Sequence, residues 1–334
     1  MIASTALVAR REIDPVEIEI FADLLNRISR FRSLANHAYG GMSGFALDDQ
    51  KALYRTLGLR HMLSFDERLE VVNRQRFNRP TMLHRVTNAT VREFASEWPQ
   101  KFVDEGIEDA DGHILWIRSD GSAEVGRSVR DFQQMVGSLG RYGIARTTIA
   151  VDYNDWASEP ADEAGPRRTA DQIRAAVAQR VRDFLSEHLE ESDLGRTMDI
   201  DGLCDCVASA FGNAASEAVG ASTGIVFEPL SVIRYGANPS RITLTGMLIG
   251  LEERAALRER VEENGWPFAS SRWSDVRDVI LPDLTGRERL ELERAGGDRA
   301  WAADKLLFDL DRATGVSGAF DGFCRFHRYL PSAA

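Results

Sequence analysis

The sequence predicts an α/β protein with a mostly parallel sheet, helices on both faces, a helical insertion and a late antiparallel hairpin. Three observations predict this fold class. Short apolar runs alternate with segments of helical periodicity through the first 155 residues, which is typical of strand–helix–strand units. Two amphipathic helical segments then follow one another without a strand between them. Two long apolar strands come next, separated by a turn that contains Gly and Pro.

The alternation of segments in the first 155 residues predicts the parallel strands and the helices that connect them. Residues 14–33 form an amphipathic helix that starts at Asp14-Pro15, a cap followed by a first-turn proline. A first strand ends near Tyr39, and a helix over residues 46–57 stops at Gly58. Further elements alternate in the order strand 61–65, helix 67–77, strand 82–86, helix 91–98, strand 113–117, helix 128–139 and strand 147–151.

The pattern changes after residue 155. Residues 156–168 predict an exposed linker or lid, and helices over 169–191 and 200–219 complete an insertion. Strands 225–235 and 242–251 flank a Gly–Pro turn and predict a hairpin that joins the same sheet.

The remaining part is predicted to be helical and loop-rich, with 323–331 packed on the sheet as a final strand or helix. The expected organisation is an N-terminal helical segment (1–33), a Rossmann-like core (34–155), a helical insertion or lid (156–222) and a hairpin with a C-terminal helical region (223–334).

Composition narrows the class of protein. The 334 residues are 43% hydrophobic, which is enough for a sizeable core. The net charge of -11 argues against non-specific nucleic-acid binding, because Lys and Arg provide that affinity. Three cysteines and six histidines show no metal-ligand spacing. The sequence has no secretion signal and no apolar run of the ~20 residues that a membrane helix needs, so we expect a cytoplasmic protein without membrane attachment. Homo-oligomerisation is left open.

Glycines and an acid predict a nucleotide-type cofactor site. Gly40, Gly41 and Gly44 indicate a tight turn between a strand and a helix, where the backbone can approach a ligand. Asp66 follows the next strand, where a carboxylate can accept hydrogen bonds from ribose hydroxyls. An ordinary glycine turn followed by a helix-capping Asp explains the same pattern equally well.

Polar residues that follow three later strands form a second signal. They are Thr87 and Asn88, Ser119 and Asp120, and Asp152 with Asn154. The carboxyl ends of parallel strands share one edge of a sheet, so we expect these side chains near each other, although each alone could be a loop residue or a cap. Arg234, at the hairpin tip, could orient an anion or be a solvated hairpin end, and His37 is the one histidine considered for a role.

The ordered set of segments resembles a group of bacterial O-methyltransferases with the class I, Rossmann-type fold. The resemblance is carried by Tyr39-Gly-Gly-Met-Ser-Gly-Phe45, Leu59-Arg-His-Met-Leu-Ser-Phe-Asp66, Arg76-Phe-Asn-Arg-Pro80, Trp116-Ile-Arg-Ser-Asp-Gly121, Phe227-Glu-Pro-Leu-Ser-Val-Ile-Arg-Tyr235, Thr243-Leu-Thr-Gly246, Leu281-Pro-Asp-Leu-Thr-Gly-Arg-Glu288 and Arg325-Phe-His-Arg-Tyr-Leu-Pro331. The family tends to show Trp-Leu-Asp-Tyr-Asp-Gly at the fourth of these, so Arg118 and Ser119 replace an acid and an aromatic residue.

The resemblance implies S-adenosylmethionine as cofactor and assigns residues to it. Tyr39, Gly40, Gly41 and Gly44 would lie under its methionine part, Asp66 would hold the ribose, and Thr87 and Asn88 would flank the adenine. Ser119 and Asp120 would face the sulfonium and the acceptor. Asp120 or Asp152 could take the acceptor's proton as general base.

The predicted function is therefore methyl transfer to an oxygen or nitrogen of a small-molecule or macromolecular acceptor. Two alternatives stay open from the sequence. One is a non-catalytic, regulatory or defence-associated module that keeps a nucleotide pocket, because similar folds can bind ligands without catalysis. The other is a different Rossmann enzyme, such as a dehydrogenase or a nucleotide hydrolase.

Overall fold

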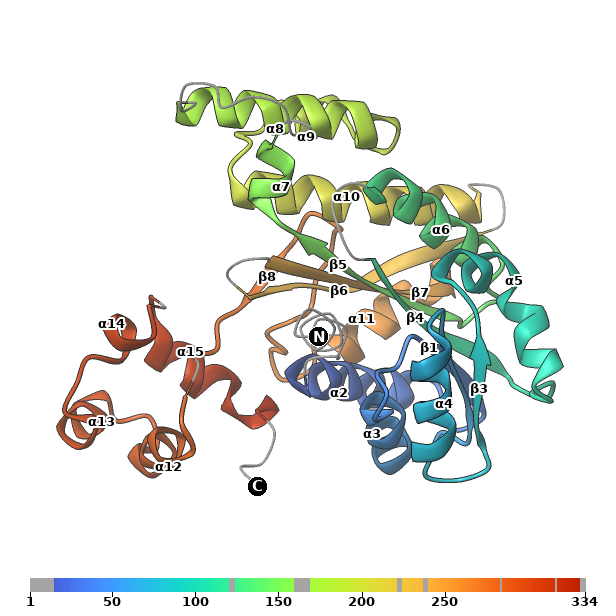
Figure 1. The fold of residues 1–334 in the computed structure, drawn as a ribbon, viewed down its shortest axis with the longest axis horizontal. Coiled ribbons are helices and arrows are strands. Elements are labelled where there is room, and N and C mark those ends of the chain that lie inside the picture. The colour runs from blue at the N-terminus through green and yellow to red at the C-terminus, as the bar shows by residue number, and fades with distance from the viewer. Residues whose placement is uncertain are drawn as a thin grey trace.

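A computed structural model describes residues 15–119, 124–158, 169–220, 224–236, 240–282, 284–315 and 317–330. Within these ranges, eight strands form one sheet in the order β3-β2-β1-β4-β5-β7-β6-β8 (Figure 1). The strands are β1 (His37–Gly41), β2 (His61–Asp66), β3 (His84–Asn88), β4 (Gly112–Ser119), β5 (Ile144–Val151), β6 (Ile225–Tyr235), β7 (Ser240–Gly250) and β8 (Arg277–Val279).

The strand directions confirm the predicted fold class. Strands β3, β2, β1, β4 and β5 are parallel, and β7 runs antiparallel between β5 and β6. The chain fills the sheet outward from β1 to β3 and then returns to the other side of β1 with β4. The order reverses between β1 and β4, which makes the carboxyl ends of these two strands the topological switch point, where open α/β sheets bind ligands.

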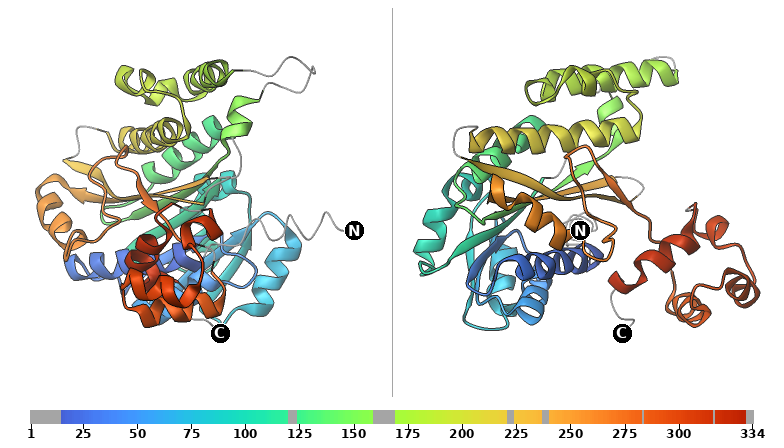
Figure 2. Two further views of the ribbon diagram at one scale, coloured as in Figure 1. Left: turned by 90° about the vertical axis from the view of Figure 1, so that its left-hand side faces the viewer. Right: turned by 180° about the vertical axis from the view of Figure 1, so that it is seen from behind.

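Helices cover both faces of the sheet (Figures 1 and 2). One face carries α2 (Pro15–Phe31), α3 (Asp48–Leu57), α4 (Leu69–Asn78) and α11 (Arg254–Val261); the other carries α5 (Val91–Asp104), α6 (Val125–Gly137) and α10 (Ile200–Val219). Short α7 (Tyr153–Ala157) follows β5, and α8 (Ala170–Leu185) and α9 (Glu191–Leu194) of the insertion stack on α10. Apolar side chains divide accordingly into two large buried clusters, one on each face.

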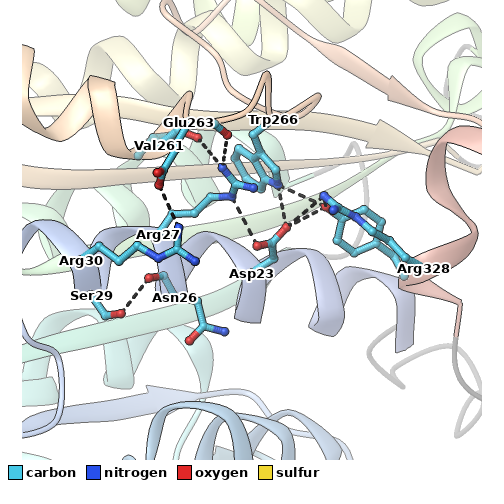
Figure 3. A network of polar contacts seen from close by, with 10 residues as sticks. Asp23, Asn26, Arg27, Ser29, Arg30, Val261, Glu263, Trp266 and Arg328 are labelled. Carbon is cyan, nitrogen blue, oxygen red and sulfur yellow. Dashed lines mark hydrogen bonds and ion pairs between the residues drawn. The ribbon is translucent and has the colours of Figure 1, made fainter.

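The C-terminal helices form a separate lobe beside the sheet (Figure 2). It contains α12 (Gly286–Ala295), α13 (Arg299–Leu306), α14 (Leu310–Thr314) and α15 (Ala319–Phe326), and its buried apolar side chains make a small core of their own. Asp23 of α2 accepts hydrogen bonds from Trp266 Nε1 at 2.9 Å and from the Tyr329 hydroxyl at 2.7 Å. Arg27 and Arg30 of α2 bind Glu263 nearby, so one polar network ties α2 to the end of the lobe (Figure 3).

Several elements differ from the sequence predictions. Gly40 and Gly41 lie inside β1 and not in a turn, and β3 starts two residues later than expected, so Thr87 and Asn88 end that strand. The three-residue β8 was not predicted. The expected packing of 323–331 is confirmed where this segment is described: it is helical, and Phe326 and Tyr329 join the core on the α2 face of the sheet. Most of the predicted 156–168 linker lies outside the described residues, and Trp156 is buried at the end of α7.

Candidate functional site

A cavity of about 350 Å³ opens at the carboxyl edge of the sheet, at the switch point. Strand register explains why distant segments meet there, since Gly41 pairs with both Ser64 of β2 and Trp116 of β4. The Met42 amide continues this contact by donating to the Trp116 carbonyl at 3.2 Å. The lining residues are Met42, Glu67, Thr90, Val91, Arg92, Arg118, Ser119, Glu124, Arg127, Ser128 and Asp131.

Gly40 and Gly41 are explained by packing inside the protein. A Cβ on Gly40 would lie 2.8 Å from Phe102 Cζ and 2.9 Å from Phe94 Cζ, and a Cβ on Gly41 would collide with the Tyr39 ring. Tyr39 itself is buried and donates to Asp49 at 2.5 Å. None of these three residues lines the cavity, and their assignment to the cofactor stays a prediction.

Side chains of α4 form hydrogen bonds to the loop that follows β1. Gln75 Nε2 donates to the Ser43 carbonyl at 2.5 Å, and Asn78 Nδ2 donates to the Phe45 carbonyl at 3.0 Å. Gly44 lies half-buried between them, and Ser43 adds a 2.7 Å hydrogen bond to Asp49. The contacts fix the position of the chain that leads from the cavity into α3.

The two acids at the end of β2 have different surroundings. Asp66 is 2% exposed, and its Oδ1 accepts from the Arg68 amide at 2.8 Å and from Arg68 Nε at 3.0 Å. Glu67 is exposed and lines the cavity. The predicted convergence of the glycine segment and the acid is present at one edge, but Glu67 and not Asp66 reaches the cavity.

Thr87 and Asn88, which are predicted to flank the adenine, lie close to the cavity but are not among its lining residues. Asn88 is exposed, and its Nδ2 donates to the Asp66 carbonyl at 2.8 Å. Thr87 is half-buried in β3, and three residues further along, Thr90–Arg92, line the cavity instead. Ser119 does line it, and its hydroxyl hydrogen bonds to Ser128 of α6.

Of the two predicted general bases, only Asp152 is among the described residues. Asp120 lies outside them. Asp152 caps α7, where its Oδ1 accepts from the Asn154 amide at 2.9 Å. Its neighbours Tyr153 and Asn154 line a separate cavity of about 430 Å³ with residues of α8 and α10.

Two further candidate residues, Arg234 and His37, are not among the residues that line the cavity. Arg234 binds Asp278 at 2.6 Å and Asp201 at 2.5 Å, and its side chain is 18% exposed, so it is an ion-paired residue and not the solvated hairpin end that the sequence offered as the alternative to anion binding. His37 begins β1 and pairs with Gly112, the first residue of β4, so it lies at the sheet edge opposite the cavity.

Among the described residues, no group of three or more His, Cys, Asp or Glu could hold a metal ion. No helix in the described part of the chain is long and apolar enough to cross a membrane.

Asp131 is a cavity residue that the sequence pattern does not single out. It lies on α6 and is 9% exposed. Burial raises the pKa of its carboxyl group, and the charges of Arg92, Arg127 and Arg130 oppose that rise. The available signal was a charged residue directly before Phe132 on the apolar side of the predicted helix.

A second unpredicted feature is a buried charge network between α2 and the strands that it covers. Glu17 of α2 is 1% exposed and accepts from Thr148 and Thr243 at 2.6 Å each, and from the Tyr235 hydroxyl. Arg146 Nη2 lies 3.3 Å from the same carboxylate. Burial alone would raise the pKa of Glu17, but Arg146, Arg118 and the two threonine hydroxyls outweigh it and lower that pKa.

Comparisons with known proteins give one family and a set of distant structures. A family described as "Putative O-methyltransferase" matches residues 11–333. No curated protein matches the chain significantly.

Solved structures similar to the chain include Trm1 from Pyrococcus horikoshii with S-adenosyl-L-methionine (8% identity, TM-score 0.41, covering 73% of this chain and 58% of that one). LepI in complex with SAM follows (10% identity, TM-score 0.35, 67% and 46%). A third is an S-adenosylmethionine-dependent methyltransferase from Mesorhizobium loti (13% identity, TM-score 0.31, 68% and 97%). The chain thus spans about half the length of the first two.

Proposed function

The chain belongs to the family described as "Putative O-methyltransferase", and we propose that it transfers a methyl group from S-adenosylmethionine bound at the carboxyl ends of β1, β2 and β4. One observation carries the placement: a cavity of about 350 Å³ at the switch point, lined by both carboxylates and guanidinium groups. Cavities of roughly 300–1,000 Å³ are usual for ligands of this size.

The residues of the cavity fit the chemistry of that cofactor. Its ribose hydroxyls need an acceptor, which Glu67 provides, and its carboxylate needs a donor such as a guanidinium. When bound, the cofactor supplies an electrophilic methyl group on a sulfonium. The protein's contribution is then to hold donor and acceptor in line and to exclude water.

An oxygen or nitrogen acceptor also needs a group that takes its proton. Asp120 and Asp152 stay proposals for this role. Asp131 is the buried carboxylate of the cavity lining, and burial raises the pKa of its carboxyl group. A carboxylate with a raised pKa is a better proton acceptor near neutral pH than an ordinary one.

The two acids at the end of β2, Asp66 and Glu67, provide the test. Glu67→Gln should weaken binding of S-adenosylmethionine and of its demethylated product by about 5- to 150-fold, the loss expected for a hydrogen-bonded charged group. Asp66→Asn should lower the melting temperature, since it loosens the contact with Arg68, and change affinity little. Isothermal titration calorimetry and thermal melts measure both quantities on the same samples.

The opposite outcome, with affinity lost only in Asp66→Asn, would return the ribose to the acid that the sequence predicted. If the wild-type protein binds neither compound, the methyltransferase proposal fails and the non-catalytic module is favoured. Nicotinamide nucleotides titrated under the same conditions test the dehydrogenase alternative.

A further inference from the structure

A cavity of about 750 Å³ lies at the edge of the sheet opposite the proposed cofactor site. Its walls are the first residues of β6, one side of α10, the segment 190–196 that contains α9, and the loop before β8. Glu228, a lining residue of β6, pairs with the same Met247 of β7 as Ile144, the residue at which β5 begins. The parallel strands end at the other edge, so this cavity lies outside the proposed site of methyl transfer.

Helix α10 presents a polar stripe to this cavity although most of the helix is buried. Ser209, Asn213, Ser216 and Glu217 line the cavity and recur at the three- and four-residue spacing of one helix face. The remaining positions of α10 are mostly apolar and belong to the core. A helix that is buried on its other sides needs partners for such a polar stripe.

Two residues of the stripe have hydrogen-bonding capacity that the described part of the protein does not use. Ser209 is 4% exposed, and its hydroxyl has no hydrogen-bond partner among the described residues. Asn213 donates from Nδ2 to the His188 carbonyl at 3.0 Å, and no described residue donates to its Oδ1. Buried polar groups are nearly always hydrogen-bonded, so a hydroxyl and an amide oxygen remain for a molecule in the cavity.

Both buried carboxylates of the lining are already paired. Glu228 is 1% exposed and lies 2.8 Å from Arg254 Nε, and Asp193 is 7% exposed and lies 3.1 Å from Arg196 Nη2. A charged ligand would have to compete with these ion pairs. The interior of the cavity therefore suits an uncharged ligand that forms hydrogen bonds.

An aromatic pair adds an apolar part to the lining. Trp273 and Phe227 both line the cavity, and their rings stack with centroids 5.3 Å apart. Two glycines make room for Trp273, because a Cβ on Gly212 would collide with its ring and a Cβ on Gly246 would lie 2.7 Å from its Cη2. Trp273 Nε1 donates to Ser216 Oγ at 3.3 Å, which fixes the ring further.

We propose that this cavity binds an uncharged ring compound that carries several hydroxyl groups and has the size of a mono- or disaccharide. A hydroxyl both donates and accepts, as Ser209 and Asn213 require, and the C–H groups of the ring would pack on the aromatic pair. The volume of about 750 Å³ lies in the usual range for small-molecule sites, roughly 300–1,000 Å³. Free sugars and the ribose of a nucleoside share this chemistry, and the experiment distinguishes them.

Saturation-transfer difference NMR on the full-length chain tests the proposal with glucose, galactose, mannose, maltose and uridine. We expect at least one of these probes to bind in the millimolar range or more tightly. A signal from a sugar identifies a free sugar as the source, and a signal from uridine alone identifies a nucleoside. Glucose 6-phosphate tests the charge, and it should bind no more tightly than glucose.

Matched serine variants assign the binding to this cavity. Ser209→Ala should weaken the bound probe by about 2- to 12-fold, the loss typical of one uncharged hydrogen bond, and leave the melting temperature unchanged. Ser209→Leu should abolish binding by filling part of the cavity. Ser231→Ala is the control: its hydroxyl is 1% exposed and has no partner in the described structure, but Ser231 does not line the cavity, so affinity should stay the same.

Three results would overturn the proposal. Binding of none of the probes would leave a cavity filled by water only. Equal affinities in the Ser209→Ala, Ser209→Leu and Ser231→Ala proteins would place the bound probe elsewhere, and tighter binding of glucose 6-phosphate than of glucose would refute an uncharged ligand. Affinity for S-adenosylhomocysteine should be unchanged in all three variants, so the outcome is distinguishable from a failure of the proposed function.

Discussion

The two faces of the central sheet are filled by different kinds of side chain. Beneath α5, α6 and α10, the strands meet an apolar core that includes Phe94, Phe132 and Phe211. Beneath α2 and α3, apolar residues surround the ionised pair Glu17 and Arg146 and the hydrogen-bonded pair Tyr39 and Asp49. The same strands supply both faces, because side chains alternate along a strand.

Apolar burial and buried ion pairs contribute differently to the free energy of folding and to the positions of side chains. Apolar burial stabilises without direction, at about 25 cal/mol per Å². Buried ion pairs often give no net stability compared with apolar residues, because taking the charges out of water costs about as much as their attraction returns. On the α2 face, the hydrogen bonds of Glu17 hold α2, β5, β6 and β7 in one fixed arrangement.

The largest expected effect comes from breaking the charge network. Glu17→Ala would leave Arg146 buried without its carboxylate, and loss of one partner of a buried pair typically costs about 3–5 kcal/mol. Urea denaturation measures the free energy of unfolding. Glu19→Ala is the matched control, an exposed acid on the same helix, and should change it by less than about 0.5 kcal/mol. Equal effects would mean that the network is not formed as described.

A smaller loss of stability is expected from a substitution on the face covered by α5, α6 and α10. Gly40→Ala would place a methyl group within 3 Å of Phe94 and Phe102, and such overpacking typically costs about 1–3 kcal/mol. Gly286→Ala, with no atom within 4 Å of the added carbon, serves as control. Affinity for S-adenosylmethionine should change little in Gly40→Ala. A large loss of affinity at unchanged stability would support the cofactor role that the sequence predicted for Gly40.

The alternation of strands and helices could be predicted because it rests on local periodicity. Helix α10, for example, was predicted at Ile200–Val219 from its spacing of apolar residues. Gly40 and Gly41 were misplaced because their reason is tertiary: rings from α5 and from Tyr39 occupy the space of a side chain. Three-residue β8 is too short to produce a pattern.

The sheet edge at which the cavity lies could be predicted, but the residues that line it could not. Parallel strands bring their carboxyl ends to one edge, so the region around Met42, Glu67 and Ser119 could be located. Which acid faces the cavity could not, because Asp66 is held by Arg68, a neighbour whose direction depends on the turn. The partners of Glu17 lie 129 to 226 positions away along the chain, a distance at which sequence spacing gives no signal.

The smallest expected effect is on the pH dependence of stability. Two buried carboxylates on the face covered by α2 and α3, Glu17 and Asp49, should change it in opposite directions. The pKa of Glu17 is below its ordinary 4.5, so its contribution to stability is present above that pH and is lost as pH falls through the folded value. Burial raises the pKa of Asp49 above its ordinary 3.8, so its contribution falls as pH rises from there through the folded value. In unfolding measured from pH 3 to pH 7, Glu17→Gln should therefore flatten the loss of stability in acid, whereas Asp49→Asn should remove the fall above about pH 4. Both variants shifting the curve in the same direction would contradict the assignment of one carboxylate as ionised and the other as favouring its proton.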